Sequence, residues 1–503
     1  MTQTTQSIET YRMFVDGEWV DSSSGAFFEV LNPYTGQAWA RVPRGNGEDV
    51  NKAVASAKKA LESDSWKEMT GAARRNLLLA LGKQIEQNAE RLGMTETKSN
   101  GKLYREIVPQ AKSFSEFFYY YAGWADKLVG ETIPLTETRD VLCYTLREPI
   151  GVVAAVTPWN APLLLTIMKM APALAAGDTL VIKPSRYTPV TAIALAEMVE
   201  AAGFPPGVVN VVTGIGSEIG DTLLRHPDVN KISFTGSTDV GREVYRSASE
   251  NIAKVTLELG GKSPNIVFED AEMDNAVNGV LGGIFGFNGQ ICVAGSRVLL
   301  HSRIADEFLD RLVRRARTIK LGDPMDIETE MGPISNYDQL TKVEQYVKLG
   351  QEEGGVLVYG GKKPDDSRLS NGMFYLPTIM RIRNNMKIGQ EEIFGPVVGI
   401  IEFDNDDEAV QIANDIRYGL AAGIWTSDIR RANRVVRRLK AGTVWINTYG
   451  LLPAAAGPFG GYKRSGVGRE NGFEAMEEYT QIKCVWVDLH KQIGDPFRQP
   501  SRS

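Results

Sequence analysis

Cys292 is the residue with the most distinctive chemistry in this sequence. It stands in the segment FNGQICVAGSR (287–297), with glycines at positions 289 and 295. Glycine leaves space beside the backbone, so a substrate could approach the sulfur closely. A lone cysteine is more often a small hydrophobic core residue, yet a thiolate is the strongest side-chain nucleophile near neutral pH. We therefore treat Cys292 as a candidate nucleophile.

Asn160 and Glu258 are polar residues in apolar surroundings. Asn160 lies in a Trp-Asn turn between a buried strand and an apolar helix. Its amide could donate to the oxygen of an attacked carbonyl, although the side chain could instead bond its own backbone in the turn. Glu258 stands between two leucines in a strand. A carboxylate there is costly unless it is paired or the strand lies at a sheet edge, and its burial would raise its pKa.

Two glycine-containing segments are candidates for binding a dinucleotide. FTGS (234–237) opens a helix after a strand, and the unpaired N–H groups of a helix start attract pyrophosphate. GIGSEIG (214–220) is similar to a dinucleotide fingerprint, but it has one residue too many between its last two glycines. We interpret it mainly as a turn followed by a helix, with Gly220 near an adenine at most.

The elements that must position these residues are strands alternating with helices. Apolar runs at 151–156, 179–183, 208–212, 231–234 and 254–259 are typical of buried parallel strands. A helix capped by Thr188, with Pro189 at its first position and Gly203 at its end, is one of the connections. We predict an α/β fold with a doubly wound parallel sheet, whose ligands bind beyond the carboxyl ends of the strands. The candidate residues should therefore follow strands.

Further elements flank this sheet. Asp16-Gly17 predicts a hairpin. Two amphipathic helices carry apolar faces, Val50, Val54, Ala57 and Leu61 in the first and Leu78, Leu81, Ile85 and Leu92 in the second. A second α/β unit contains helices at 303–318 and 407–414 and strands at 356–358 and 397–403. Strand-like segments at 136–147 and 481–488 lie outside both units.

Composition excludes several classes of protein. A chain of 503 residues is too long for one core, so we expect two or three domains. The net charge of −6 disfavours nucleic-acid binding, and the basic run 430–440 fits a solvated helix face. The three cysteines and three histidines lack metal-ligand spacing, which disfavours a disulfide scaffold, a zinc site and a Ser-His-Asp triad.

Neither a membrane span nor a targeting segment is predicted. The apolar region 150–176 is interrupted by three prolines and Lys169. The first fourteen residues are polar and lack the apolar core of a secretory signal. We expect a cytoplasmic protein without metal, nucleic acid or membrane partners.

Seven segments together resemble the aldehyde dehydrogenase superfamily along nearly the whole chain. They are TPWNAP (157–162), IKPS (182–185), FTGSTDVG (234–241), LELGGKSP (257–264), FNGQICVAGSR (287–297), EEIFGPV (391–397) and PFGGYKRSG (458–466). Each motif alone is weak, but the shared order and spacing are specific. The resemblance implies a dinucleotide-binding domain at 1–130 and 151–257, a catalytic domain at 258–480, and a β oligomerisation segment at 131–150 and 481–503.

The resemblance also implies an NAD(P)-dependent oxidation of an aldehyde to an acid. Cys292 would attack the aldehyde, with the oxyanion held by the Asn160 amide and the Cys292 N–H. After hydride transfer to the nicotinamide, Glu258 would activate the water that hydrolyses the thioester. Glu470 matches an acid credited with relaying protons, and an exposed helical glutamate is the alternative.

The cofactor implied by the resemblance is NAD or NADP. The matching residues are Trp159, Lys183, Ser185, Arg186, Gly220, Gly236, Ser237, Glu392 and Phe394. Lys183 and Ser185 match adenosine-ribose contacts, whereas Glu392 matches the nicotinamide-ribose contact and Phe394 lies on the nicotinamide side. Arg186 replaces an acidic residue of many members. A guanidinium can pair with a 2′-phosphate, so we expect NADP to be accepted unless Arg186 points to solvent.

The substrate tunnel implied by the resemblance is apolar. Its residues would be Leu164, Leu165, Met168, Ile291, Val293, Leu451 and Phe459, while Ile167 is expected in the core. No arginine is among them to pair with a second carboxylate. We predict aliphatic, terpenoid or aromatic aldehydes in preference to semialdehydes of diacids.

Two alternatives stay open on the same fold. A coenzyme A-acylating enzyme is disfavoured because a hydrolytic base at Glu258 would waste its thioester. A non-catalytic binding or structural protein has no need of Cys292, Asn160 and Glu258 together. Family members associate through segments matching 136–147 and 481–488, which predicts a homodimer or homotetramer and hides strand edges.

Overall fold

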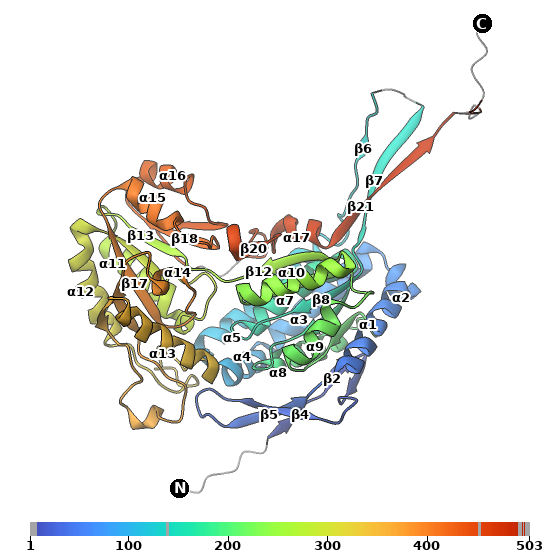
Figure 1. Ribbon diagram of the computed structural model, residues 1–503. Coiled ribbons are helices and arrows are strands. Elements are labelled where there is room, and N and C mark those ends of the chain that lie inside the picture. The colour runs from blue at the N-terminus through green and yellow to red at the C-terminus, as the bar shows by residue number, and fades with distance from the viewer. Residues whose placement is uncertain (1–7, 137–139, 451–453, 491–494, 496, 498–503) are drawn as a thin grey trace.

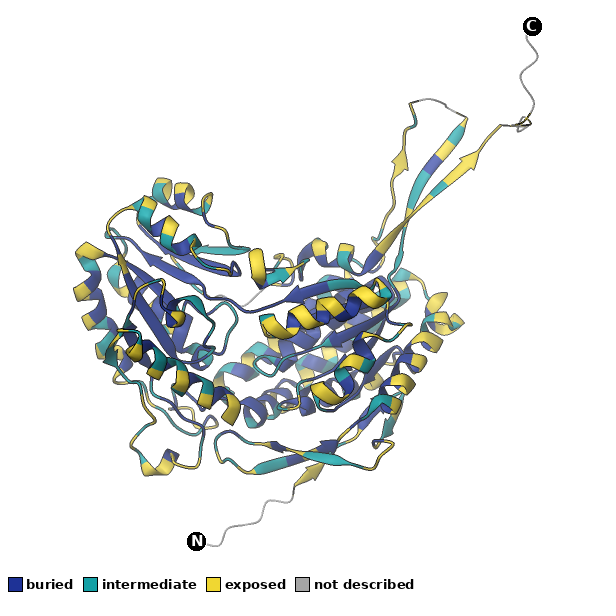
Figure 2. Ribbon diagram, in the orientation of Figure 1, coloured by how far each residue is buried: buried dark blue, intermediate teal, exposed yellow. Residues whose placement is uncertain are grey.

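The computed structural model describes residues 8–136, 140–450, 454–490, 495 and 497. Two α/β lobes lie side by side, and an arm of β-strands projects from the first lobe (Figure 1). The central strands of both lobes are buried, and the exposed residues lie mainly on the outer helices and the arm (Figure 2). The architecture confirms the predicted α/β class with a doubly wound parallel sheet.

The first sheet has eight strands in the order β20-β12-β11-β8-β9-β10-β2-β3. Its five central strands are parallel. They are β8 (Val152–Val156), β9 (Thr179–Lys183), β10 (Val209–Val211), β11 (Lys231–Thr235) and β12 (Lys254–Glu258). Successive strands are added first on one side of β8 (β9, β10) and then on its other side (β11, β12). The segments that follow β8 and β11 therefore border the ligand crevice expected at such a switch point.

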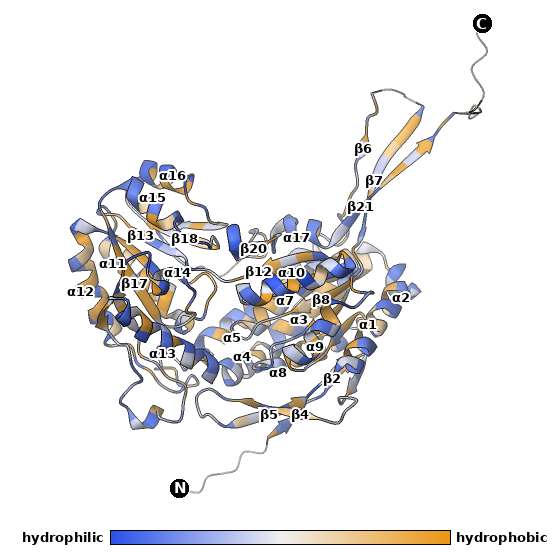
Figure 3. Cartoon of the chain, in the orientation of Figure 1, coloured by the Kyte–Doolittle hydropathy of each residue, from blue (hydrophilic) through white to orange (hydrophobic). Residues whose placement is uncertain are grey.

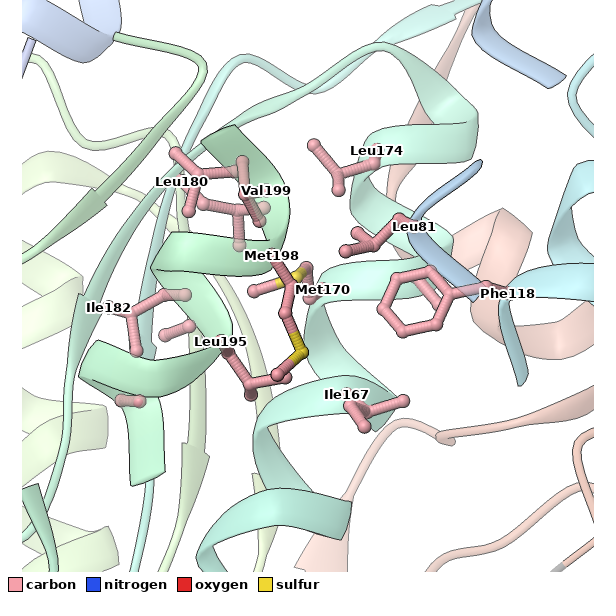
Figure 4. Close-up of a cluster of buried hydrophobic side chains, with 14 of the residues drawn as sticks. Leu81, Phe118, Ile167, Met170, Leu174, Leu180, Ile182, Leu195, Met198 and Val199 are labelled. Carbon is pink, nitrogen blue, oxygen red and sulfur yellow. The ribbon is translucent and has the colours of Figure 1, made fainter. Parts of the chain in front are cut away.

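Alternating strand residues serve two separate cores. Val153 and Ala155 face helices α3, α7 and α8, whereas Val152 and Ala154 face α1, α9 and α10. Figure 4 shows the first of these cores, in which Leu180 and Ile182 of β9 pack against apolar side chains of α7 and α8. Because both faces are covered, the central strands are mostly apolar, and hydrophobic residues gather in the interior of each lobe (Figure 3).

Helices surround the first sheet on both faces. They are α1 (Gly47–Glu62), α2 (Asp64–Lys67), α3 (Gly71–Gln87), α4 (Ala89–Asn100), α5 (Tyr104–Ser113), α6 (Ser115–Ala122), α7 (Pro162–Ala176), α8 (Pro189–Ala201), α9 (Gly216–Leu224) and α10 (Thr238–Asn251). The second amphipathic helix was predicted as one element, which is wrong. It divides at Asn88, whose backbone leaves the helical conformation, and Leu92 belongs to α4.

Two turn predictions have different outcomes. The hairpin at Asp16-Gly17 is confirmed, because both residues have positive φ and join β2 (Met13–Val15) to β3 (Glu18–Val20). Thr188 occupies the N-cap position of α8 as predicted, but its side chain makes no capping hydrogen bond. Pro189 supplies the start of this helix, since its ring fixes a helical φ.

The second sheet has seven strands in the order β15-β16-β17-β14-β13-β18-β19. They are β13 (Pro264–Val267), β14 (Arg297–His301), β15 (Val356–Tyr359), β16 (Thr378–Arg381), β17 (Val397–Phe403), β18 (Ala421–Trp425) and β19 (Thr443–Ile446). All neighbours are parallel except β15 and β16. The helices of this lobe are α11 (Met273–Phe285), α12 (Ala305–Ala316), α13 (Tyr337–Glu352), α14 (Lys387–Gln390), α15 (Asp406–Asn414) and α16 (Ile429–Val436).

The last part of the chain returns to the first lobe. β20 (Gly466–Val467) pairs with β12, and α17 (Gly472–Glu478) packs against α7. By its hydrogen bonds this segment belongs with the first sheet, although it falls within the range 258–480 assigned to the catalytic domain. The domain ranges otherwise stay a proposal.

Two small sheets complete the fold. β1 (Glu9–Thr10), β4 (Phe27–Leu31) and β5 (Ala38–Pro43) form one, and β6 (Thr132–Ile133), β7 (Val141–Pro149) and β21 (Thr480–Asp488) form the arm. The two segments predicted outside the lobes therefore pair with one another, although residues 137–139 lie outside the described part. None of the described helices is long and apolar enough to cross a membrane.

Candidate active site

The candidate residues gather where the two lobes face one another. Three contacts join them across this region. The Asn160 amide donates to Gln290 O at 2.9 Å, the rings of Trp159 and Phe394 meet edge to face at 5.3 Å, and Gly261 N donates to a Glu392 carboxylate oxygen at 2.9 Å. The fold therefore brings together candidate residues that are far apart along the chain.

The expected position after strands holds in the first lobe only. Asn160 follows β8, Lys183 ends β9, Ser237 follows β11 and Glu258 ends β12. In the second lobe Cys292 precedes β14, and Glu392 and Phe394 precede β17. The second sheet presents the amino ends of its strands to the carboxyl ends of the first.

The loop that carries Cys292 has a constrained backbone. Phe287 and Asn288 have positive φ, as has Gly289. A Cβ at Gly289 would lie 2.2 Å from Gly395 O, so only glycine fits. The loop is fastened to the segment before α13, because Asn288 Nδ2 donates to Pro333 O at 2.5 Å and Ser335 N donates to Gln290 Oε1 at 3.0 Å.

Cys292 and Glu258 both have perturbed acidities. Burial, followed by the nearby carboxylates of Glu258 and Glu392, raises the pKa of Cys292 to about 12. Burial and the adjacent Glu470 raise the pKa of Glu258 well above its usual range. Both Glu258 carboxylate oxygens are buried and lack a hydrogen-bond partner among the described residues. A carboxylate becomes a stronger base when its pKa is raised. Such a group can accept a proton near neutral pH, where an ordinary glutamate is too weak a base to do so.

Glu470 is buried beside Glu258. It forms an ion pair with the buried Lys169, whose ammonium also donates to Thr235 Oγ1 at 2.7 Å. The alternative of an exposed helical glutamate is therefore wrong, since Glu470 lies in the loop before α17 and is shielded from solvent.

The residues predicted to hold a dinucleotide border the first sheet's crevice. The Lys183 ammonium donates one hydrogen bond, to Pro184 O at 3.1 Å, and burial lowers its pKa to about 8. Ser185 is half-buried in the loop that follows. Ser237 is the N-cap of α10, and Gly236 precedes it. Lys183 has further N–H hydrogens with which it could donate to a ribose, and the start of the fourteen-residue helix α10 could attract a pyrophosphate.

The other end of the proposed cofactor site lies in the second lobe. The Glu392 carboxylate lies against Gly260, where a Cβ would stand 2.4 Å from its oxygen. Phe394 has a positive φ, and Gln339 Nε2 holds this loop by donating to Ile393 O and Phe394 O. The role of Gln339 was not predicted from the sequence, because a polar residue near the start of a helix gives no sign of a contact with a distant loop.

Arg186 and Gly220 have distinct surroundings. Arg186 is exposed but does not point freely into solvent, because it pairs with Asp338 of α13 at 3.1 Å and contacts the Tyr187 hydroxyl. Gly220 lies within α9 with open space beside its Cα. The segment 214–220 is a turn and a helix start, as interpreted.

A cavity of about 360 Å³ opens at Cys292 and Asn160. It is lined by six of the seven predicted tunnel residues, Leu164, Leu165, Met168, Ile291, Val293 and Phe459. The seventh, Leu451, lies outside the described residues. Ile167 is buried in the core as expected (Figure 4). The lining also includes residues that the sequence did not indicate, among them Lys102, Gln110, Phe114, Phe287 and Trp445.

Comparisons with known proteins agree with this geometry. A model of the aldehyde dehydrogenase family matches residues 19–485. The betaine aldehyde dehydrogenase of Bacillus subtilis (strain 168) is 44% identical over 477 residues, which are 94% of this chain and 96% of the relative. Human retinaldehyde dehydrogenase 3 is 42% identical over 482 residues, 95% of this chain and 93% of the relative. A crystal structure of betaine aldehyde dehydrogenase from Staphylococcus aureus in complex with NAD+ superposes with a TM-score of 0.95, at 41% identity over 97% of each chain. The resemblance found in the sequence is confirmed, and the chain belongs to the aldehyde dehydrogenase family.

Proposed function

We propose that this aldehyde dehydrogenase works through a covalent thioester on Cys292 and that its substrate is an apolar aldehyde. The observation that carries the proposal is the placement of Cys292 and Asn160 at one cavity, with Glu258 buried close to the sulfur and unpaired among the described side chains. A nucleophile, a donor for the developing oxyanion and a base are the groups that the reaction requires.

The chain's own residues account for the steps around hydride transfer. Cys292 loses its proton and bonds to the aldehyde carbon, while the Asn160 amide and the Cys292 N–H hold the oxygen. NAD(P)+, when bound, accepts the hydride. Glu258 then takes a proton from the water that attacks the thioester, and the acid leaves as the sulfur regains a proton.

Glu258 distinguishes hydrolysis from acyl transfer to coenzyme A. A base beside the thioester favours water, so we propose a hydrolytic enzyme. The test follows reduction of the nicotinamide with and without coenzyme A. Turnover that yields free acid and is indifferent to coenzyme A supports the proposal, whereas turnover only with coenzyme A contradicts it. No reduction with any reactive aldehyde would favour a binding protein.

The cavity lining supports apolar substrates. Its described residues are mainly apolar and include no arginine to pair with a second carboxylate. Its one cation, Lys102, already lies 4.6 Å from the centre of the Phe287 ring. Although several relatives are named for betaine aldehyde, we propose aliphatic, terpenoid or aromatic aldehydes for this chain. We expect a higher kcat/KM for hexanal or benzaldehyde than for betaine aldehyde or succinate semialdehyde, and the reverse order would contradict the assignment.

We further propose that the arm joins copies of this chain into a homodimer or homotetramer. It carries exposed apolar side chains on β7 and β21, which include Leu142, Leu146, Ile482 and Trp486. Exposed apolar strands favour association, because an isolated projecting sheet leaves both faces and its edges in water.

A further inference from the structure

The C-terminal end of α4 contacts the turn that carries Asn160. Asn100, the last residue of this helix, is only 3% exposed. Its side-chain nitrogen donates to Trp159 O at 3.3 Å and to Asn160 O at 3.2 Å. Its side-chain oxygen accepts from Lys102 N at 3.1 Å. The amide group of Asn100 is therefore fully used, and two of its three bonds hold consecutive carbonyls of one turn.

The same helix end also holds the start of α7. Glu96 is buried, and one of its carboxylate oxygens accepts from Leu163 N at 3.2 Å. The other oxygen pairs with the Lys102 ammonium at 2.7 Å. Side chains from α4 thus hold both the turn itself, at Trp159 and Asn160, and the start of α7, at Leu163.

Lys102 extends this support to the nucleophile loop. Its ammonium lies over the ring of Phe287, which belongs to the segment that leads to Cys292. Beyond it, the Asn160 amide donates one hydrogen to Gln290 O at 2.9 Å, and an amide group carries two. The second hydrogen is free to serve the cavity only if the backbone of Asn160 keeps its place.

We propose that Asn100 is a positioning residue, which holds the backbone of Trp159 and Asn160 so that the Asn160 amide meets the oxyanion formed at Cys292. The inference rests on the proposed function, because it assumes that Asn160 is the oxyanion donor. A donor contributes fully only when it is held within ~0.5 Å of its working position. The two hydrogen bonds from Asn100, together with the buried bond from Leu163 N to Glu96, provide such a restraint on the turn.

The test compares Asn100→Ala with wild type in the burst of reduced nicotinamide. We expect the burst rate to fall about 10- to 100-fold, because a displaced donor stabilises the transition state less. The rate of Cys292 alkylation by iodoacetamide should stay unchanged, since that reaction forms no oxyanion. In an Asn160→Ala background, Asn100→Ala should cause no further loss, because it acts through Asn160.

Asn210 offers a matched control. It is fully buried in β10, its side-chain nitrogen donates to Leu180 O and Gly207 O, and its oxygen accepts from Asp16 N. Asn210→Ala therefore removes the same set of three bonds at a distance from Cys292, and we expect a comparable loss of thermal stability with an unchanged burst rate.

Three results would overturn the inference: a wild-type burst rate in Asn100→Ala, an equal fall in Asn210→Ala, or a full additional loss in the Asn160→Ala background. If Asn100→Ala does not fold, Asn100→Ser, which keeps a shorter donor, goes through the same comparison. A wild-type burst rate in Asn160→Ala alone would instead contradict the proposed function.

Discussion

Cys292 lies in surroundings that favour its thiol over its thiolate. Burial and two nearby carboxylates raise its pKa to about 12. Below that pKa the thiolate fraction grows with pH, so we expect the alkylation rate of the cofactor-free protein to rise about tenfold per pH unit between about pH 7 and 9. Iodoacetamide labelling followed by peptide mass spectrometry measures this rate. A rate independent of pH would mean that another group already ionises the sulfur.

Replacement of Cys292 separates chemistry from cofactor binding. Cys292→Ala should lower aldehyde oxidation by at least about a thousandfold, because neither of the other two cysteines, Cys143 and Cys484, lines the cavity. Cofactor affinity, measured by titration, should be kept. Cys484→Ser is the control, since Cys484 lies in the arm with its sulfur 3.6 Å from that of Cys143 and should leave most activity. Turnover in Cys292→Ala near the wild-type rate would disprove the covalent route.

Glu258→Gln should divide the reaction into its two halves. The thioester forms, but its hydrolysis lacks a base, so we expect one burst of reduced nicotinamide and then a stall. Mass spectrometry should find the acyl group on the peptide that contains Cys292. Full steady-state turnover without such an adduct would exclude Glu258 as the base.

At the residue scale, motifs predicted the chemically active side chains but not the residues that hold them in position. Cys292, Asn160 and Glu258 stand in segments with unusual residue types, so the sequence indicated them. Asn100 and Gln339 lie in polar helix ends, where an asparagine or glutamine usually faces water. Their partners lie 59 and 54 residues away in the chain, and no local pattern reports such a pairing.

At the element scale, the parallel strands were predictable because a strand covered on both faces is a continuous apolar run. The break between α3 and α4 was not, since Leu81, Ile85 and Leu92 keep an apolar spacing across Asn88. The position of the Cys292 loop relative to the two sheets was not predictable from the sequence either. A loop between two elements does not show which sheet edge it borders until the strand order is known.

The loop after β9 and the start of α13 meet at Arg186 and Asp338, and this contact bears on cofactor choice. Exposed ion pairs contribute at most about 1 kcal/mol, so a 2′-phosphate can compete with Asp338 for Arg186. We predict that NADP is accepted and that Arg186→Glu weakens NADP binding more than NAD binding. Dissociation constants for both cofactors decide this, with Asp338→Asn as a control that frees Arg186 and should not weaken NADP. An unchanged NADP-to-NAD ratio in Arg186→Glu would show that Arg186 does not touch the ribose.

At the scale of the whole molecule, the site needs both lobes, because neither sheet alone carries all of its residues. In the proposed mechanism, the first sheet would supply the oxyanion donor and the base at its carboxyl ends, and the second would supply the nucleophile before β14. β20 and α17 return from the second lobe to the first, which fixes the lobes relative to one another. This return also places Glu470 beside Glu258, a contact between residues 212 positions apart by number (470 − 258) that no motif predicted.

The arm is the feature that concerns assembly. Ile482 and Trp486 on β21 are each 63% exposed, in a three-stranded sheet that projects from the body of the molecule (Figure 1). A small sheet with apolar side chains in water is marginally stable alone, so we expect another copy of the chain to cover it.

Light scattering of the wild type at micromolar concentration should report a dimer or tetramer, and Ile482→Asp with Trp486→Asp should shift it toward monomer. Ile429→Asp on α16, where the side chain is 65% exposed, is the matched control and should leave the assembly intact. A monomeric wild type would refute the assembly, whereas an unchanged oligomer in the double variant would move its interface away from the arm.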